Sequence, residues 1–117
     1  MNNLMTTEIE KELNRVGLYA DKGEEYNENL CADGLQVIAH YYIPETVYHW
    51  FILGGEKENG EWVLFGFVHI SCGELGLIYL SDLERIKLKV YGITRCVVRD
   101  IDEMDTLGNM KKKYNIN

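Results

Sequence analysis

Apolar residues near the start of the chain recur at the spacing of a helix. Ile9, Leu13 and Val16 fall on one face of a 3.6-residue repeat, and acidic residues occupy its first turn. Thr6 or Thr7 can cap that turn, and the glycine that follows Val16 is a usual end signal. The pattern predicts a short amphipathic helix over residues 8–16 whose apolar stripe packs on a sheet.

Further along the chain the apolar period changes to two. The segments 35–43, 46–53 and 61–70 alternate in this way and are predicted to be strands. Pro44 and Glu45 are expected to turn the first strand into the second. The run "GGEKENG", residues 54–60, is interpreted as the hairpin loop between the second and the third. Residues 20–34 are polar and rich in turn formers, and we expect a long loop there.

The run "GELGLIYLSDLERI", residues 73–86, combines two elements. Leu75, Leu77 and Tyr79 alternate with their neighbours and predict a fourth strand. Ser81 and Glu84 have the spacing of a capping box, which predicts that a short helix starts at Ser81. The two glycines of the run are interpreted as a turn and as a close approach of backbones.

These elements define the expected fold class. A fifth strand is predicted over 94–100, after the short helix. The chain is therefore expected to be α+β: a mostly antiparallel sheet of about five strands, with an N-terminal helix and a short helix after the fourth strand. Its 117 residues predict a single domain, 1–117, and we expect a flexible tail from about residue 106 that includes the basic run Lys111–Lys113.

Large apolar residues lie on both faces of the predicted strands. Either both faces of the sheet are covered, or one face is an exposed aromatic surface. In the second case Tyr42, Tyr48, Trp50 and Trp62 are the candidate protein-binding residues. Glu74 joins them as a candidate because it is the one acid within a glycine-flanked, otherwise apolar run.

Charge and cysteine content narrow the class of partner and the compartment. Nineteen acidic and twelve basic residues give a net charge of −7, which disfavours direct nucleic-acid binding and favours basic protein surfaces. No segment approaches the about 20 apolar residues of a membrane span, and the N-terminus lacks a signal-peptide pattern. Three separated cysteines without C-x-x-C spacing are interpreted as reduced thiols in a cytoplasmic protein. Neither GxxxxGK nor GxGxxG occurs, so no cofactor is predicted.

The three histidines, His40, His49 and His69, all fall on predicted strands. If residues 43 and 46 pair across the turn, His40 lies directly opposite His49, where two imidazoles can share a metal ion. His69 or Glu74 would supply a third ligand, although no HxH or HExxH spacing is present. Half-exposed histidines without a ligand are the alternative interpretation.

Cys72 lies three positions after His69, in the run "HISCGE". A cysteine beside a histidine is the pairing that nucleophilic thiol catalysis needs. A structural cysteine is the alternative, since free cysteines are often buried as small apolar residues.

Two runs carry a resemblance to a known family. "FGFV" at 65–68, followed within ten residues by "GELGLIYLSDLE" at 73–84, resembles a small bacterial domain of unknown function whose members occur on plasmids, conjugative elements and phages. The similarity extends from about residue 13 to 100 and includes "LY" at 18–19, "HYYIP" at 40–44, Trp50 and Asp100. Two positions depart from the family: His40 replaces a lysine, and Leu53 with Gly54 replaces an acid. The resemblance implies a mobile-element context, in which small acidic proteins often bind and block host proteins.

The leading hypothesis is a non-enzymatic binding module. It would contact a host nucleic-acid-processing protein through an aromatic sheet face and acidic loops. The alternative is a small enzyme or metal-binding protein that uses the strand histidines with Glu74. A homodimer formed through an open sheet edge is a third interpretation.

Overall fold

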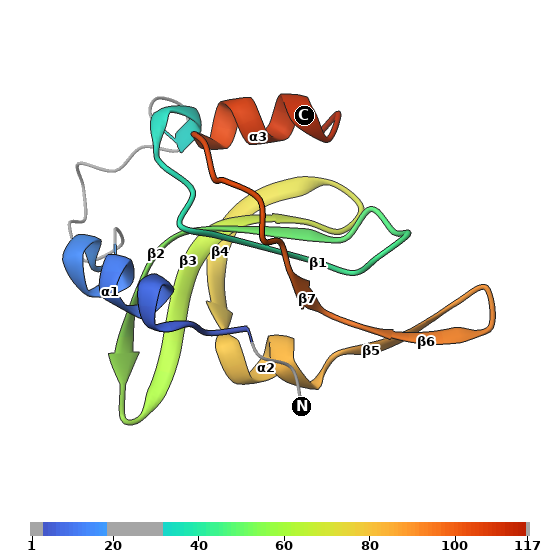
Figure 1. Cartoon of the computed structure of the whole chain (residues 1–117), viewed down its shortest axis with the longest axis horizontal. Helices are drawn as coiled ribbons and strands as arrows, with labels where there is room; N and C mark the ends of the chain where they lie inside the picture. Colours follow the sequence, from blue (N-terminus) through green and yellow to red (C-terminus); the bar gives the residue numbers. More distant parts are fainter. Residues whose placement is uncertain (1–3, 19–31, 117) are drawn as a thin grey trace.

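A computed structural model describes residues 4–18 and 32–116 (Figure 1). Most of the predicted loop over 20–34, together with Cys31, lies outside the described residues. Within the described ranges, no helix has both the length and the apolar character needed to cross a membrane.

Short helices and strands follow one another along the described chain. In order, the elements are α1 (Thr7–Val16), the 3-10 helix η2 (Ala32–Gly34), β1 (Ala39–Tyr42), β2 (His49–Glu58), β3 (Glu61–His69), β4 (Gly73–Tyr79), α2 (Leu80–Arg85), β5 (Lys87–Val90), β6 (Ile93–Cys96), β7 (Val98–Arg99) and α3 (Leu107–Lys113).

The main sheet has five strands in the order β4-β3-β2-β1-β7, and every neighbouring pair is antiparallel. Strands β5 and β6 form a separate two-stranded sheet. This arrangement confirms the predicted α+β class, with α1 at the N-terminus and α2 directly after β4.

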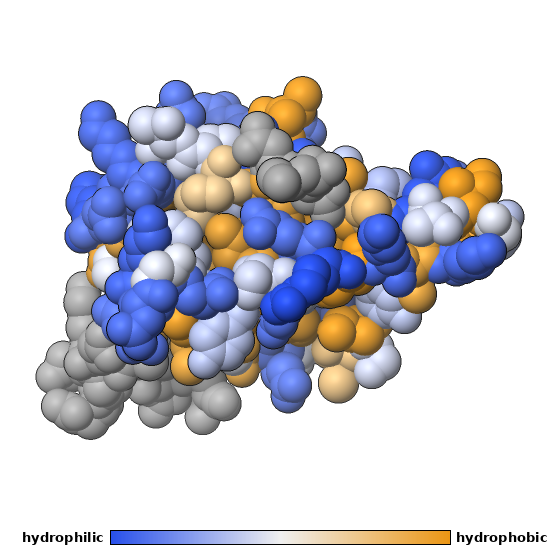
Figure 2. All heavy atoms as spheres, turned by 90° about the horizontal axis from the view of Figure 1, so that it is seen from below, coloured by the Kyte–Doolittle hydropathy of each residue, from blue (hydrophilic) through white to orange (hydrophobic). Residues whose placement is uncertain are grey.

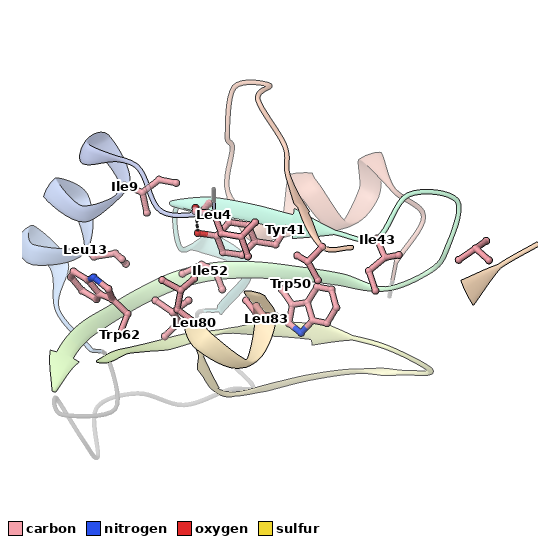
Figure 3. Close-up of a cluster of buried hydrophobic side chains, with 14 residues drawn as sticks. Leu4, Ile9, Leu13, Tyr41, Ile43, Trp50, Ile52, Trp62, Leu80 and Leu83 are labelled. Carbon is pink, nitrogen blue, oxygen red and sulfur yellow. Dashed lines mark hydrogen bonds between the residues drawn. The ribbon is translucent and has the colours of Figure 1, made fainter. Parts of the chain in front are cut away.

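Both faces of the main sheet are covered by helices. Helices α1 and α2 lie on one face, and α3 with η2 lies on the other (Figure 1). The first face forms a core with α1 and α2 that contains Trp50 and Trp62, and the hydroxyl of Tyr41 donates to the backbone oxygen of Leu4 at 2.7 Å (Figure 3). The second face forms a core with α3 that contains Phe51 and Phe67. The first of the two interpretations of the apolar strands is therefore the one observed.

Helix α1 has the end signals that its sequence predicts. Thr6 is the N-cap, and its hydroxyl oxygen accepts from the backbone N–H of Ile9 at 3.1 Å. Gly17 ends the helix in the left-handed region at φ 72°, where a residue without Cβ is favoured.

The hairpin between β2 and β3 is tighter than predicted. Strand β2 continues through the expected loop to Glu58, and only Asn59 and Gly60 form the turn, with φ of 53° and 81°. Positive φ at both central residues is the requirement of a two-residue mirror-image turn, and Asn-Gly is its preferred sequence. The predicted seven-residue loop was wrong because Gly54 and Gly55 lie in the strand, just after a register shift at Ile52/Gly54.

The capping box predicted at Ser81 is not formed. Helix α2 starts one residue earlier, with Tyr79 as an N-cap that makes no side-chain cap bond. The hydroxyl and the backbone N–H of Ser81 instead donate to the carboxylate of Glu61, at 2.8 and 3.2 Å. The carboxylate of Glu61, at the start of β3, thus accepts the backbone N–H of Ser81, which the predicted capping box assigns to Glu84.

The end of the chain departs from the sequence prediction twice. The strand predicted over 94–100 is divided into β6 and β7 by buried Val97. The expected flexible tail forms α3, capped by the hydroxyl of Thr106 at 3.4 Å from the N–H of Asn109. The tail prediction was wrong because Leu107 and Met110 pack into the second core, which offsets the cost of ordering the segment.

Candidate functional site

A network of hydrogen-bonded polar side chains, centred on buried His40, links four segments on the α3 side of the sheet: β1, β2 and the residues just after β7 and α3. Nδ1 of His40 lies 2.9 Å from Oδ2 of Asp100, and its Nε2 lies 2.8 Å from Nδ1 of His49. The hydroxyl of Tyr114, just after α3, donates to the same Asp100 oxygen at 3.0 Å. The backbone also ties the ends together, because the N–H of Asp100 donates to the carbonyl oxygen of His40 at 2.9 Å.

Strand register explains how the two histidines meet. His40 pairs with Phe51, and His49 pairs with Tyr42, so the predicted direct His40–His49 pairing was wrong by two residues. The link runs over residues 43–48 rather than the shortest turn, closed by the N–H of Ile43 on the oxygen of Tyr48 at 3.2 Å. A two-residue shift keeps both side chains on one face, where diagonal neighbours are within reach of long or aromatic side chains.

Aromatic stacking holds the His40 ring in place. This side chain is fully buried, at 0% exposure. Its ring lies 4.5 Å from that of Phe51 with an interplanar angle of 9°, and 5.3 Å from that of Tyr42. Stacking with Phe51 and Tyr42, together with hydrogen bonds at both ring nitrogens, fixes the orientation of the imidazole.

The protonation states follow from burial and partners. Burial lowers the pKa of His40 against the opposing influence of Asp100. Burial, followed by the neighbouring imidazoles, lowers the pKa of His49 to about 4. Burial raises the pKa of Asp100, but hydrogen bonds from a backbone N–H, His40 and Tyr114 outweigh it, and the pKa lies below its usual value. Burial and the Asp100 carboxylate raise the pKa of Tyr114 to about 12.

These states assign the imidazole tautomers. The Asp100 carboxylate only accepts, so Nδ1 of His40 carries the proton. Nε2 of neutral His40 is then an acceptor, and Nδ1 of His49 must donate to it. The remaining nitrogen of His49, Nε2, carries a lone pair.

His69 lies beside this network of hydrogen-bonded side chains. It is directly opposite His49 across β2 and β3, and its Nδ1 donates to the carbonyl oxygen of Val47 at 2.8 Å. Both side chains border a cavity of about 150 Å³, which is lined by Thr46, Val47, His49, His69, Tyr114, Asn115 and Ile116. His49 and His69 therefore meet at one cavity, whereas both ring nitrogens of His40 are already hydrogen-bonded, so His40 is not the metal ligand that the hypothesis requires.

The proposed third ligand Glu74 does not join them. It is exposed on β4 and pairs with Val68, whose side chain packs toward the α1 and α2 core, so it lies on the opposite face of the sheet. Among the described residues, no group of three or more His, Cys, Asp or Glu is arranged to hold a metal ion.

The thiol hypothesis gains no support from the geometry. Cys72 is an exposed free cysteine in the turn between β3 and β4. Nδ1 of His69 is bonded to the Val47 backbone, and no hydrogen bond between His69 and Cys72 occurs within the described part of the chain.

The predicted aromatic surface is divided among different environments. Trp50 and Trp62 are buried, at 5% and 6% exposure, so neither is a surface residue. Tyr42 is half-buried against His40, and Tyr48 is half-buried against the first core. The prediction failed because alternation shows which residues share a face, whereas the helices that cover that face come from distant segments.

An apolar region that includes two of the predicted residues, Tyr48 and Trp50, lies at the β5–β6 end of the molecule. There a cavity of about 190 Å³ is lined only by apolar or aromatic residues: Ile43, Tyr48, Trp50, Ile70, Ile86 and Leu88. Beyond it, the arm formed by residues 87–96 projects away from the main sheet (Figure 1), and apolar residues are visible near its tip (Figure 2). Tyr91 at the tip is 90% exposed and Ile93 is 54% exposed. We call the cavity and the arm together the apolar end.

The arm differs in charge from the rest of the chain. It contains Lys87, Lys89 and Arg95 and no acidic residue, in a protein of net charge −7. Arg95 reaches back to Glu45 at 2.6 Å and so ties the arm to the β1–β2 link. The apolar end is therefore a basic-flanked apolar projection on an acidic protein.

Comparison with known proteins identifies no relative. Neither the scan of family models nor the searches of curated proteins and of solved structures found a match. The resemblance to the mobile-element family stays a prediction, and function has to be argued from the geometry.

Proposed function

We propose that the protein is a protein-binding module and that the apolar end is its contact surface. The observation that carries the proposal is Tyr91, a large aromatic side chain that is almost fully exposed at the tip of the arm. Exposed apolar residues that gather at one place on a surface are typical of protein interaction sites, and tyrosine is enriched in them.

The backbone at Tyr91 supports this interpretation. Tyr91 and Gly92 form a two-residue turn with φ of 52° and 82°, nearly the same values as the Asn59–Gly60 turn. A bulky side chain is disfavoured at positive φ, where asparagine and glycine are preferred. The chain therefore has the favoured residue in one turn and a disfavoured, exposed aromatic in the other. A contact made by the Tyr91 ring explains this choice, whereas the stability of the turn does not.

The chemistry of the arm defines the partner. Tyr91 and Ile93 fit an apolar pocket, and the basic residues on the arm favour an acidic rim around it. The mobile-element resemblance makes a host nucleic-acid-processing protein the first class to test, with the acidic remainder of the chain available to its basic regions.

Replacing Tyr91 by asparagine is expected to separate binding from stability. The variant should lose its partner, since the anchor ring is gone. Its free energy of unfolding should rise by about 0.5–1 kcal/mol, because asparagine suits the left-handed turn position. Affinity capture from bacterial lysate with immobilised protein, together with thermal and urea unfolding, measures both effects.

The matched control is Ile101→Asn, which also removes a large exposed apolar side chain but lies outside the arm. Partners captured by the wild type and the Ile101 variant but not by Tyr91→Asn support the proposal. If self-association replaces capture and is lost only in Tyr91→Asn, the surface is correct and the partner is a second copy. Equal capture by all three proteins contradicts the proposal.

A further inference from the structure

The cavity beside α3 presents two imidazole nitrogens in the same chemical state. Nδ1 of His69 donates to a backbone carbonyl, so in the neutral ring the lone pair is on Nε2. Nδ1 of His49 donates to His40, so its Nε2 is in the same state. Both side chains are partly exposed.

Strand pairing places these two rings together. His49 and His69 are directly opposite on adjacent antiparallel strands, where the Cβ atoms of such pairs are roughly 4.5–5.5 Å apart. Both side chains point to the α3 face and border the same cavity of about 150 Å³. Thr46 and Asn115 line it as well.

We propose that His49 and His69 form a two-histidine site for a divalent transition metal such as Zn²⁺, with its other coordination positions filled by water or an external ligand. Neutral imidazole nitrogens are favoured ligands for zinc, copper and nickel. Metal-ligating histidines almost always donate the other ring N–H to a carbonyl, a carboxylate or an equivalent acceptor, which orients the ring before the metal arrives. His49 and His69 already donate their Nδ1–H to such an acceptor, the ring of His40 and the carbonyl oxygen of Val47.

The hydrogen-bonded side chains behind His49, His40 and Asp100, form a second layer around the site. His40 accepts from His49 and is itself held by the Asp100 carboxylate, so negative charge behind the ring supports a positive ion in front of it. This inference does not depend on the proposed binding function, since the cavity lies on the α3 side of the sheet and shares no lining residue with the apolar cavity.

Calorimetric titration of Zn²⁺ into untagged protein tests the site. We expect one ion per chain, with an affinity reduced by about tenfold or more in His49→Gln and in His69→Gln, since each removes half of the protein ligands. Asp100→Asn should weaken binding by roughly 10- to 100-fold, the usual effect of removing an outer-layer partner. Glu74→Gln is the control and should bind as the wild type does, because Glu74 lies on the opposite face of the sheet.

A spectroscopic measurement on the unaltered protein keeps the test independent of variant folding. Co²⁺ should broaden the imidazole NMR signals of His49 and His69 before those of any other side chain. Absence of Zn²⁺ binding overturns the proposal, as does binding that neither histidine variant changes or Co²⁺ broadening centred elsewhere.

Discussion

Gly66→Ala is expected to destabilise the protein by about 3 kcal/mol or more, at the upper end of what overpacking of a well-packed site costs. A Cβ added at Gly66 would lie 2.2 Å from the carbonyl oxygen of Phe51 and 3.1 Å from Cα of Ile52. Both contacts are with the backbone of β2, at the point where its register shifts. Side-chain rotation cannot relieve such contacts, so the central β2–β3 ladder has to move.

Gly76→Ala is the matched control for this prediction. Gly76 is the register partner of Gly66 on β4, yet a Cβ there would meet no heavy atom within 4 Å. Its free energy of unfolding should stay within about 0.5 kcal/mol of the wild type. Urea unfolding of the two variants side by side measures the difference, and equal stabilities would show that the β2 backbone does not constrain Gly66.

The same comparison corrects the interpretation of the "GELG" run. The close approach expected for one of its glycines occurs at Gly73, where a Cβ would lie 2.0 Å from the ring of Phe67. Gly76 has no such neighbour. Packing of an aromatic ring over a strand glycine, rather than contact between backbones, explains the first glycine of the run.

Asp100→Ala should lower the free energy of unfolding by about 3 kcal/mol. The change removes the acceptor of the His40 Nδ1–H, of the Tyr114 hydroxyl and of the backbone N–H of Asp102. His40 is fully buried, and a buried donor left without an acceptor costs roughly 1–3 kcal/mol. The Tyr114 hydroxyl loses a charge-assisted bond of about 1.5–3 kcal/mol, which water at the cavity replaces in part.

Asp102→Ala is the control for that loss. It removes an exposed carboxylate two residues away, whose ion pair with Lys113 spans 3.8 Å and contributes at most about 1 kcal/mol. Asp100→Asn should recover part of the stability, since its amide oxygen can still accept from His40. If Asp100→Ala and Asp102→Ala unfold at the same denaturant concentration, the hydrogen bonds that Asp100 accepts do not stabilise the fold.

Local signals in the sequence predicted the elements that depend on near neighbours. Thr6 and Gly17 mark the ends of α1, and the alternation of apolar and polar residues marks strands β1 to β4. The Asn59–Gly60 turn had a local signal too, which the prediction missed by treating every glycine from 54 to 60 as part of one loop. Leu107 and Met110 also recur at helical spacing, but two apolar residues in a short segment do not predict a helix without the surface on which they pack.

Errors arose where a distant residue supplied the partner. Glu61 accepts hydrogen bonds from Ser81 in the first turn of α2. The sequence of the helix alone assigns this role to Glu84. Trp50 and Trp62 were candidates for an exposed surface, but helices α1 and α2 cover them. Sequence spacing contains no information on which remote segment reaches a given face, because that choice depends on the summed packing of the whole chain.

The histidine site shows the same division. Sequence alone determined that His40 and His49 share a face, because side chains alternate with a period of two and the two-residue error in register preserved that period. Sequence alone also determined the acidic charge and the basic composition of the arm. Only the tertiary structure brought Asp100 to His40 across 60 positions, by pairing β7 with β1. It also placed His69 in the same cavity as His49. Hydrogen bonds of 2.8–2.9 Å require positions that no local pattern specifies, and they form only when the sheet and α3 close around them.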